Sequence, residues 1–168
     1  GMRAQGGPGF PRLTDDAWLW GSNPEDIEEL IRVGINSSHD DTRFAQMPPF
    51  GAGGMLEREA VLDLVTYVRS LSGAESEGAD RPEALAAGKK VFDVYCVGCH
   101  NRDGTGNPKM GAPNLTDDFW IYGGDPQSVY LSVYQGRQGH MPHWEGRLSA
   151  LQRKIITLFV LDQKSVAQ

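Results

Sequence analysis

The sequence contains only two cysteines among its 168 residues, Cys96 and Cys99. A disulfide between them would close a very short loop and stabilise the fold little. A structural zinc site needs about four ligands, usually with a second Cys or His pair, and the chain has no second cysteine pair. A thioredoxin-like redox pair needs a βαβ context, which the sequence does not indicate. The two cysteines are therefore expected to serve another kind of chemistry.

Long apolar runs are also missing. No stretch of about 18 apolar residues is present, so we expect a soluble chain that does not itself span a membrane. The opening GMRAQGGPGF lacks the apolar region of a signal peptide. Its first two residues, Gly1 and Met2, are typical of a cloning remnant joined to a start methionine. We expect that natural N-terminal sequence is missing.

Basic residues are scarce in the first half of the chain. Residues 1–80 hold 14 acidic and 6 basic residues, a net charge of −8, whereas residues 81–168 hold 8 and 10, a net charge of +2. This balance argues against nucleic-acid binding, because phosphates are bound by Lys and Arg. The acidic half is either a solvated surface or a surface that steers a basic protein partner.

Strand signals are weak, and helical patterns predict an all-α fold rich in loops. The segments 24–34 and 126–136 each begin with a proline and end at a glycine. The longer segments 58–71, 82–100 and 148–163 carry apolar residues at near-helical spacing, and Ser149 is a candidate N-cap. The segment SGAESEGADRP, residues 72–82, is small and acidic and is expected to be a linker.

An internal repeat dominates the sequence. PRLTDDAWLWG (11–21) returns as PNLTDDFWIYG (113–123), and the matches continue to Gly34 and Gly136 at one constant offset of 102 residues. The first copy then carries an insertion, INSSHDDTRFAQ, before Met47-Pro48, whereas the second has only RQGH before Met141-Pro142. Self-similarity of this extent predicts two copies of one domain. We expect domains at 1–71 and 83–168, joined by the linker 72–82.

The segment CVGCH, residues 96–100, has the C-x-x-C-H spacing of a c-type haem attachment site. Thiols one helical turn apart, Cys96 and Cys99, can add to the two vinyl groups on one edge of a porphyrin. The adjacent His100 can then offer a ring nitrogen to the iron. We therefore expect a covalent haem c.

The sixth iron ligand is expected to be a thioether, which stabilises ferrous iron and suits an electron carrier. Met141 in GHMPHW is the favoured candidate, because it lies beyond the loop and before the last helix. Met110 is the nearest competitor but follows the attachment site very closely. A histidine, His140 or His143, could ligate instead and would lower the potential.

Residues around the predicted haem can also be named. The ring N–H of His100 is expected to donate to the carbonyl of Pro113, because proximal histidines are usually oriented in this way. Leu115 is expected to pack on the haem. Three further residues could bind the propionates or simply pack: Trp120, Tyr122 and Arg137. A glycine at position 88 would let the last helix cross the first helix of this domain closely, with Phe92 beside it.

These segments resemble the class I cytochrome c fold, in GKKVFDVYCVGCH, GAPNL and MPHW. The whole chain is similar to the dihaem cytochrome c subunit (subunit III) of cbb3-type cytochrome c oxidases, through its twin LTDD-W segments, its QMP stretch and GHMPHW. The resemblance implies two haem domains that pass electrons from a donor cytochrome c to the oxidase core, which reduces oxygen. It also implies a full-length protein anchored by one N-terminal helix, at the periplasmic face of a bacterial inner membrane, beside the other oxidase subunits.

Carried over residue by residue, the resemblance makes Cys96, Cys99 and His100 the attachment site of the second haem, Met141 its distal ligand, and Met47 the distal ligand of the first. The first domain departs from the family because it has no C-x-x-C-H. The offset of 102 would place the missing histidine before residue 1. We expect an N-terminal truncation rather than natural loss. This chain would then bind one covalent haem at most, and the full-length protein two.

Other readings stay open at this point. A peroxidase or a sulfur-compound dehydrogenase would need an open or histidine-ligated sixth position, and a haem-free metal-binding module would use Cys and His alone. The first domain also lacks the helix on which 58–71 should pack. We expect that face to be covered by the second domain, a swapped neighbour or a symmetry mate, which makes self-association possible.

Overall fold

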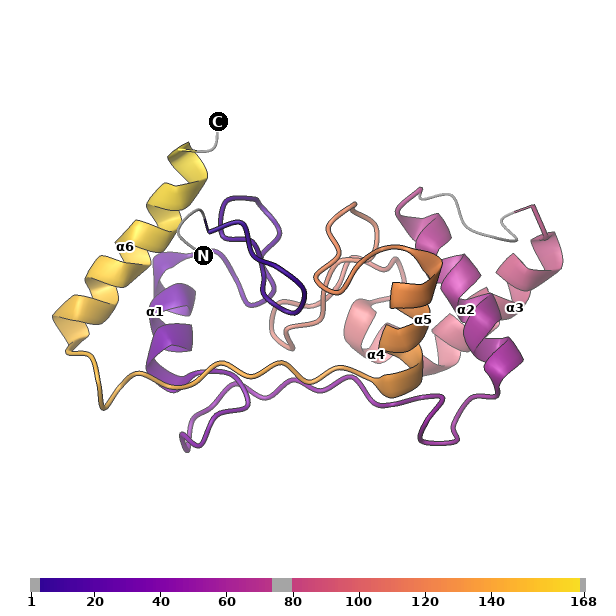
Figure 1. Ribbon diagram of the computed structural model, residues 1–168, viewed down its shortest axis with the longest axis horizontal. Helices are drawn as coiled ribbons and strands as arrows, with labels where there is room; N and C mark the ends of the chain where they lie inside the picture. Colours follow the sequence, from indigo (N-terminus) through magenta and orange to yellow (C-terminus); the bar gives the residue numbers. More distant parts are fainter. Residues whose placement is uncertain (1–3, 74–79, 167–168) are drawn as a thin grey trace. The chain divides into compact units, whose positions relative to one another are not determined.

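The computed structural model describes residues 4–73 and 80–166, and this part of the chain forms six helices and no strand. The helices are α1 (Pro24–Val33), α2 (Arg58–Leu71), α3 (Pro82–Tyr95), α4 (Val97–His100), α5 (Pro126–Gln135) and α6 (Ala150–Val166) (Figure 1). The predicted all-α class is confirmed. Among the described residues, no helix has the length and apolar character needed to cross a membrane.

The repeat is visible in the ends of α1 and α5. Each helix begins with proline after a capping side chain, Asn23 or Asp125, that accepts a hydrogen bond from a backbone N–H of the first turn. Each ends at a glycine, Gly34 or Gly136, with a φ of 71°. That left-handed conformation favours glycine, so the sequence signals marked both helix ends correctly.

Two predicted helices differ in detail from those observed. The segment 82–100 forms two helices, α3 and α4, which meet at Cys96. Asn101, with a φ of 61°, then ends α4. The last helix, predicted over 148–163, runs instead over Ala150–Val166. Ser149 Oγ accepts a hydrogen bond from the Gln152 N–H at 3.3 Å, so the predicted cap is confirmed.

The chain divides into two compact units, and each combines segments from both sequence copies. The first unit comprises Gly1–Ala45, Pro108–Gly111 and Gln138–Gln168, and the second comprises Gln46–Asn107 and Ala112–Arg137. The predicted boundary at 72–82 follows the sequence repeat, whereas the compact units are assembled across it. Residues 74–79 of the predicted linker lie outside the described residues.

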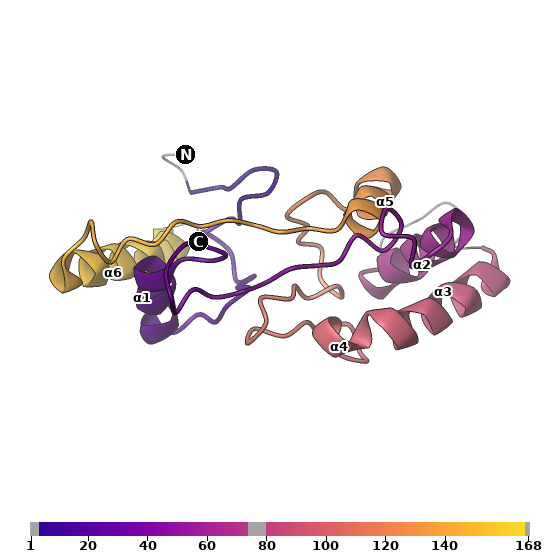
Figure 2. The ribbon, with the colours of Figure 1, turned by 90° about the horizontal axis from the view of Figure 1, so that it is seen from below.

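The second unit is built around α2. This helix packs on both α3 and α5, as Figures 1 and 2 show from two directions. Its apolar side chains form the centre of the core, with Val61 and Leu64 at most 1% exposed. The face of residues 58–71 is therefore covered by helices of the second sequence copy, which was one of the three coverings we expected.

The close helix crossing at Gly88 involves a different helix from the one expected. A side chain there would collide with the backbone carbonyl of Asp63 on α2. The Phe92 ring meets the Tyr67 ring edge-on at 5.4 Å, also on α2. The expectation that the last helix crosses here was wrong. In the second unit α2, the repeat counterpart of α6, makes this crossing.

The first unit contains α1 and α6, which pack against each other (Figures 1 and 2). An ion-pair network secures the segment before α6. Arg32 on α1 contacts Glu29 at 2.8 Å, and Asp41 and Glu145 at 3.1 Å each. The backbone N–H of Glu145 also donates to the Arg32 carbonyl at 3.2 Å.

Short backbone pairings connect the two copies within each unit. In the first unit, Ile35 and Met141 exchange two N–H···O bonds of 2.9 Å. In the second unit, Met47 and Arg137 exchange bonds of 2.8 and 3.0 Å. Ile35 and Arg137 are equivalent in the repeat, as are the two methionines. Each copy therefore pairs with the Met-Pro segment of the other copy, and we call this the exchanged arrangement.

Candidate haem-attachment site

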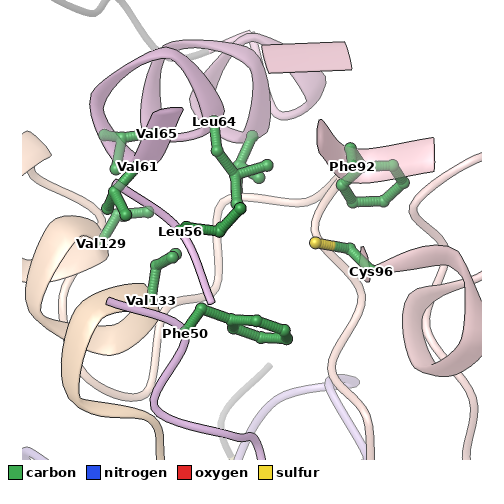
Figure 3. Close-up of a cluster of buried hydrophobic side chains, with 10 residues drawn as sticks. Phe50, Leu56, Val61, Leu64, Val65, Phe92, Cys96, Val129 and Val133 are labelled. Carbon is green, nitrogen blue, oxygen red and sulfur yellow. The ribbon is translucent and has the colours of Figure 1, made fainter. Parts of the chain in front are cut away.

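The two cysteines lie where α3 passes into α4. Cys96 is 8% exposed, Cys99 is half-buried, and both are free thiols. Figure 3 shows the Cys96 sulfur pointing into the apolar cluster, toward Leu56 and Phe50. The thiols thus sit one helical turn apart at the edge of an apolar core.

The environment keeps Cys96 uncharged. Burial raises the pKa of its thiol to about 12, and the nearby Cys99 adds to the effect. A reactive nucleophilic cysteine instead has a lowered pKa, because the thiolate is the reactive form. The arrangement therefore does not favour a thiol-redox function.

The imidazole of His100 is held by one backbone contact. Its Nδ1 lies 3.0 Å from the carbonyl oxygen of Pro113, so Nδ1–H donates and Nε2 carries the lone pair. The predicted contact is thus present. Burial lowers the pKa of His100, although this hydrogen bond opposes the shift. The ring is therefore neutral at neutral pH, with a nitrogen ready to bind a metal.

A glycine loop brings Pro113 to the histidine. Gly106 has a φ of 78°, and a side chain there would collide with the carbonyls of Ala112 and Pro113. Its N–H donates to the His100 carbonyl at 3.0 Å. The backbone of this loop therefore contacts both His100 and the segment that carries the Pro113 carbonyl, and it keeps the two close together.

The other predicted haem-pocket residues surround the same core. Leu115 and Trp120 are partly buried and pack against the apolar cluster. The Arg137 guanidinium lies 4.2 Å from the centre of the Tyr122 ring, and its Nε donates to Ser132 at 3.0 Å. All four predicted residues lie in the second unit, with Cys96 and His100.

The methionines are divided between the units. Met47 packs against the cluster that contains Cys96, whereas Met141 belongs to the first unit and is half-buried there. The histidine alternatives lie in the first unit as well. His140 is exposed, and the His143 ring lies 5.5 Å from the His39 ring.

Arg69 is a residue that the sequence reasoning missed. It is 8% exposed, and its Nε donates to the Gly124 carbonyl at 2.8 Å. Its Nη1 is buried and has no hydrogen-bond partner in the part of the chain that the structure describes. A buried polar atom without a hydrogen-bond partner is costly. The signal was present in the sequence, because Arg69 lies four residues after Val65 on the apolar face of the helix.

The donor set fits a covalent haem. Among the described residues it offers two thiols, a neutral imidazole whose Nε2 has no hydrogen-bond partner, a thioether packed on the same core, and a buried guanidinium whose Nη1 has no hydrogen-bond partner. Among the described residues, no group of three or more His, Cys, Asp or Glu side chains is placed to hold a metal ion.

Comparison with known proteins agrees with this chemistry. Residues 83–160 match the family described as cytochrome C oxidase, cbb3-type, subunit III. Over 95% of its length the chain is 44% identical to the cbb3-type cytochrome c oxidase subunit FixP of Bradyrhizobium sp. and 40% identical to subunit CcoP of Cereibacter sphaeroides. The chain is therefore similar to the cbb3-type subunit III family over almost its whole length. It spans 54% of the length of each of these relatives, which are named as subunits of an oxidase.

Proposed function

We propose that this chain carries one covalent haem c and passes single electrons to the catalytic core of a cbb3-type oxidase. The observation that carries the proposal is the geometry of CVGCH: Pro113 fixes the neutral His100 ring through Nδ1, and Nε2 has no hydrogen-bond partner among the described residues. Cys96 and Cys99 would hold the porphyrin through thioether bonds. When bound, the haem supplies a reversible one-electron couple.

The remaining residues would set the environment of the haem rather than react. Pro113 fixes the orientation of the imidazole, and the apolar cluster excludes water from its surroundings. Leu115 and Trp120 would contact the ring. Arg137 would either bind a propionate or keep its observed place on Tyr122. No acid–base group is required, because only an electron is transferred.

The family also supports proposals about the whole protein. We propose that the full-length protein carries two haems, is anchored in the bacterial inner membrane with its haem domains in the periplasm, and receives electrons from a donor cytochrome c. Its partners would be the other oxidase subunits.

Maturation in a periplasm that attaches c-type haem tests the proposal. We expect a covalent mass gain of one haem and a low-spin spectrum on reduction. The double variant Cys96→Ser with Cys99→Ser should lose the covalent haem, while the surface variant Asp118→Asn keeps it. A wild-type chain that acquires no covalent haem under these conditions would sink the proposal. A high-spin spectrum would instead favour a haem enzyme with an open sixth position.

Electron delivery is tested separately. The reduced chain should be reoxidised by a cbb3 oxidase core depleted of its own subunit III, in the presence of oxygen. Reoxidation no faster than that of an unrelated c-type cytochrome of the same net charge would contradict the proposed partner, although not the haem site.

A further inference from the structure

The unit that contains CVGCH also buries a guanidinium whose hydrogen bonds are incomplete. Arg69 lies near the end of α2 and is 8% exposed, and its Nη1 is buried without a hydrogen-bond partner among residues 4–73 and 80–166. Resting on the proposed haem function, we propose that Arg69 binds a propionate of the haem attached at CVGCH. Its positive charge would offset that of the carboxylate and keep the reduction potential high.

The guanidinium is held by a single backbone contact. Its Nε donates to the Gly124 carbonyl at 2.8 Å, which fixes the side chain but leaves Nη1 unsatisfied. A buried polar atom without a partner carries a desolvation cost. Carboxylates are the preferred partners of arginine, because the bonds are charge-assisted and fit the planar fork. A haem brings two carboxylates of this kind, its propionates.

The Gly124 contact places the guanidinium beside a residue already expected near the haem. A side chain at Gly124 would collide with the indole of Trp120. Trp120 in turn packs on the apolar cluster that contains Cys96. Arg69, Gly124 and Trp120 are therefore in direct succession, at the wall of the core into which the Cys96 sulfur points.

The end of α2 also adjoins the loop that orients the histidine. Leu71 lies two residues after Arg69, and a Cβ atom at Gly104 would lie 3.0 Å from Leu71 Cδ1. The carbonyl of Gly104 accepts a hydrogen bond from the Leu115 N–H at 2.7 Å. Gly104 and Leu115 belong to the chain segment that runs from His100 past the Pro113 carbonyl. The arginine thus lies close to this segment as well as to the tryptophan.

The nearby protein carboxylates have other partners. Among the described residues, the ion pairs include none with Arg69. Asp93 on α3 pairs with a lysine of its own helix at 2.6 Å, and Asp125 caps α5. Asp103, next to Gly104, accepts a hydrogen bond from a threonine hydroxyl at 2.7 Å. The anion that completes the guanidinium is therefore expected to come from the cofactor.

Arg137, which the sequence suggested for this role, is engaged elsewhere. Its guanidinium lies 4.2 Å from the centre of the Tyr122 ring, and its Nε donates to Ser132 at 3.0 Å. Within the described part of the second unit, Arg69 is the arginine that has a buried nitrogen without a partner. The structure therefore favours Arg69 over Arg137 as the propionate partner.

The repeat indicates that this helix position does not require an arginine. After the Met-Pro pairs the copies are offset by 94 residues, so Arg69 corresponds to Gln163 on α6. The Gln163 amide donates to the Phe159 carbonyl of its own helix at 3.4 Å. Gln163 lies in the first unit, and both cysteines lie in the second. At this position the arginine thus accompanies the attachment site.

The proposed pair has a consequence for the pH dependence of the potential. While Arg69 is present, the propionate stays ionised and its charge is offset. Without the guanidinium, the propionate binds a proton more readily, and more so in ferrous haem, because ferrous iron has one positive charge fewer. Removing Arg69 should therefore leave the potential unchanged in acid, where the propionate is protonated. It should lower the potential at higher pH, where an unpaired carboxylate favours ferric iron.

The main experiment measures the midpoint potential of the haem-loaded chain against pH. Arg69→Gln introduces the residue of the equivalent position, which is neutral but can still donate to Gly124. Its potential should equal that of the wild type in acid and fall below it as the pH rises. The final shift should be on the order of a tenfold change in the ferric-to-ferrous ratio, about 59 mV for one electron. Arg69→Lys keeps the charge and should restore most of the wild-type profile.

Arg58→Gln is the matched control, because Arg58 is exposed at the other end of the same helix. It should keep the wild-type profile. A lowering of equal size at every pH in Arg69→Gln would show that Arg69 contacts no propionate and would overturn the proposal. An unchanged potential would show that Arg69 serves only the Gly124 carbonyl.

The mass of each variant separates this proposal from the proposed function. A wild-type chain that acquires no covalent haem counts against the function itself. Variants that carry the haem but keep the wild-type potential at every pH count against Arg69 alone.

Infrared difference spectra between the two redox states test the contact directly. At the pH where its potential departs from the wild type, Arg69→Gln should show the C=O stretch of a protonated carboxyl group. The wild type and Arg69→Lys should lack this band at the same pH. Labelling the haem propionates with ¹³C should shift the band. A band that does not shift would belong to a protein carboxyl group, such as Asp125, and would exclude the propionate as the partner of Arg69.

Discussion

At the residue scale, the sites in this chain depend on backbone contacts more than on side-chain clusters. His100 is oriented by a carbonyl, and that carbonyl is brought close by a glycine without a side chain. The sequence predicted the Pro113 contact because the C-x-x-C-H chemistry requires an oriented imidazole. It did not reveal the role of Gly106, because one glycine among 21 carries no signal of what it approaches.

Gly106→Ala should destabilise the chain by about 1–3 kcal/mol, through the cost of a left-handed alanine and the collision with Ala112 and Pro113. Thermal and urea unfolding measure this loss. Gly54→Ala is a matched control, because Gly54 has a φ of 71° and open space around it. If both variants lose the same stability, the close approach to Pro113 contributes nothing.

A pH effect is also expected at the residue scale. Asp41 N–H donates to His39 Nδ1, so His39 Nε2–H donates to Glu145 at 2.7 Å. The hydrogen bond from His39 is the largest cause that lowers the pKa of Glu145 below its ordinary value of 4.5, and the hydrogen bond from Arg32 is the second. A carboxyl group whose pKa is lower in the folded state stabilises the fold at pH values above its unfolded-state pKa. This contribution is lost as the pH falls through the folded-state pKa.

Hydrogen exchange at the Trp144 and Glu145 amides should therefore speed up as pH falls below 4.5, beyond the intrinsic pH dependence of exchange. Those amides donate to carbonyls of α1, including that of Arg32. In Glu145→Gln the same amides should already exchange faster at neutral pH and respond less to acid. An acid response as large as that of the wild type would show that another group is responsible.

At the scale of elements, the helices were predictable because each carries its own start and stop signals. The span of α2 was predicted to the residue, and those of α1 and α5 to within one residue. The helix over 82–100 was not, because its interruption at Cys96 follows from the local backbone at the attachment motif. Which helices pack together was not predictable either, since α2 and α6 are repeat copies with similar apolar patterns.

The two copies of one leucine provide a matched test of this pairing. After the Met-Pro pairs the repeat offset is 94, so Leu64 on α2 corresponds to Leu158 on α6. Leu64 is 1% exposed and Leu158 is 64% exposed. Leu64→Ala should cost about 2–5 kcal/mol of unfolding free energy, whereas Leu158→Ala should cost less than about 0.5 kcal/mol. Equal losses in urea denaturation would contradict the assignment of α2 to the core.

At the scale of the whole molecule, the units cross the boundary between the sequence copies. The expectation of domains at 1–71 and 83–168 treats each copy as a folding unit. The structure instead groups α2 with α3 and α5, and α1 with α6. The sequential and the exchanged arrangements would both pack helix on helix. They differ in which sequence copy supplies the partner of each helix.

A chain cut between Gly73 and Asp80 distinguishes the alternatives. A protease site inserted there should yield two fragments that stay together in size-exclusion chromatography, because both units contain segments from each side of the cut. If the arrangement is exchanged, the two fragments should separate only when denaturant is added. Fragments that separate under native conditions, each with a folded circular dichroism spectrum, would instead support two sequential domains.

The sequence by itself determined the spans of α1, α2 and α5 and the internal repeat, and it predicted a haem-attachment motif at CVGCH, because these depend on local patterns and on residue types at fixed spacing. Only the tertiary structure decided which methionine packs against the core that contains Cys96 and which helix crosses Gly88. The physical reason is the repeat itself. Two copies of similar sequence offer each segment two candidate partners, and the choice between them depends on long-range packing that no local pattern encodes.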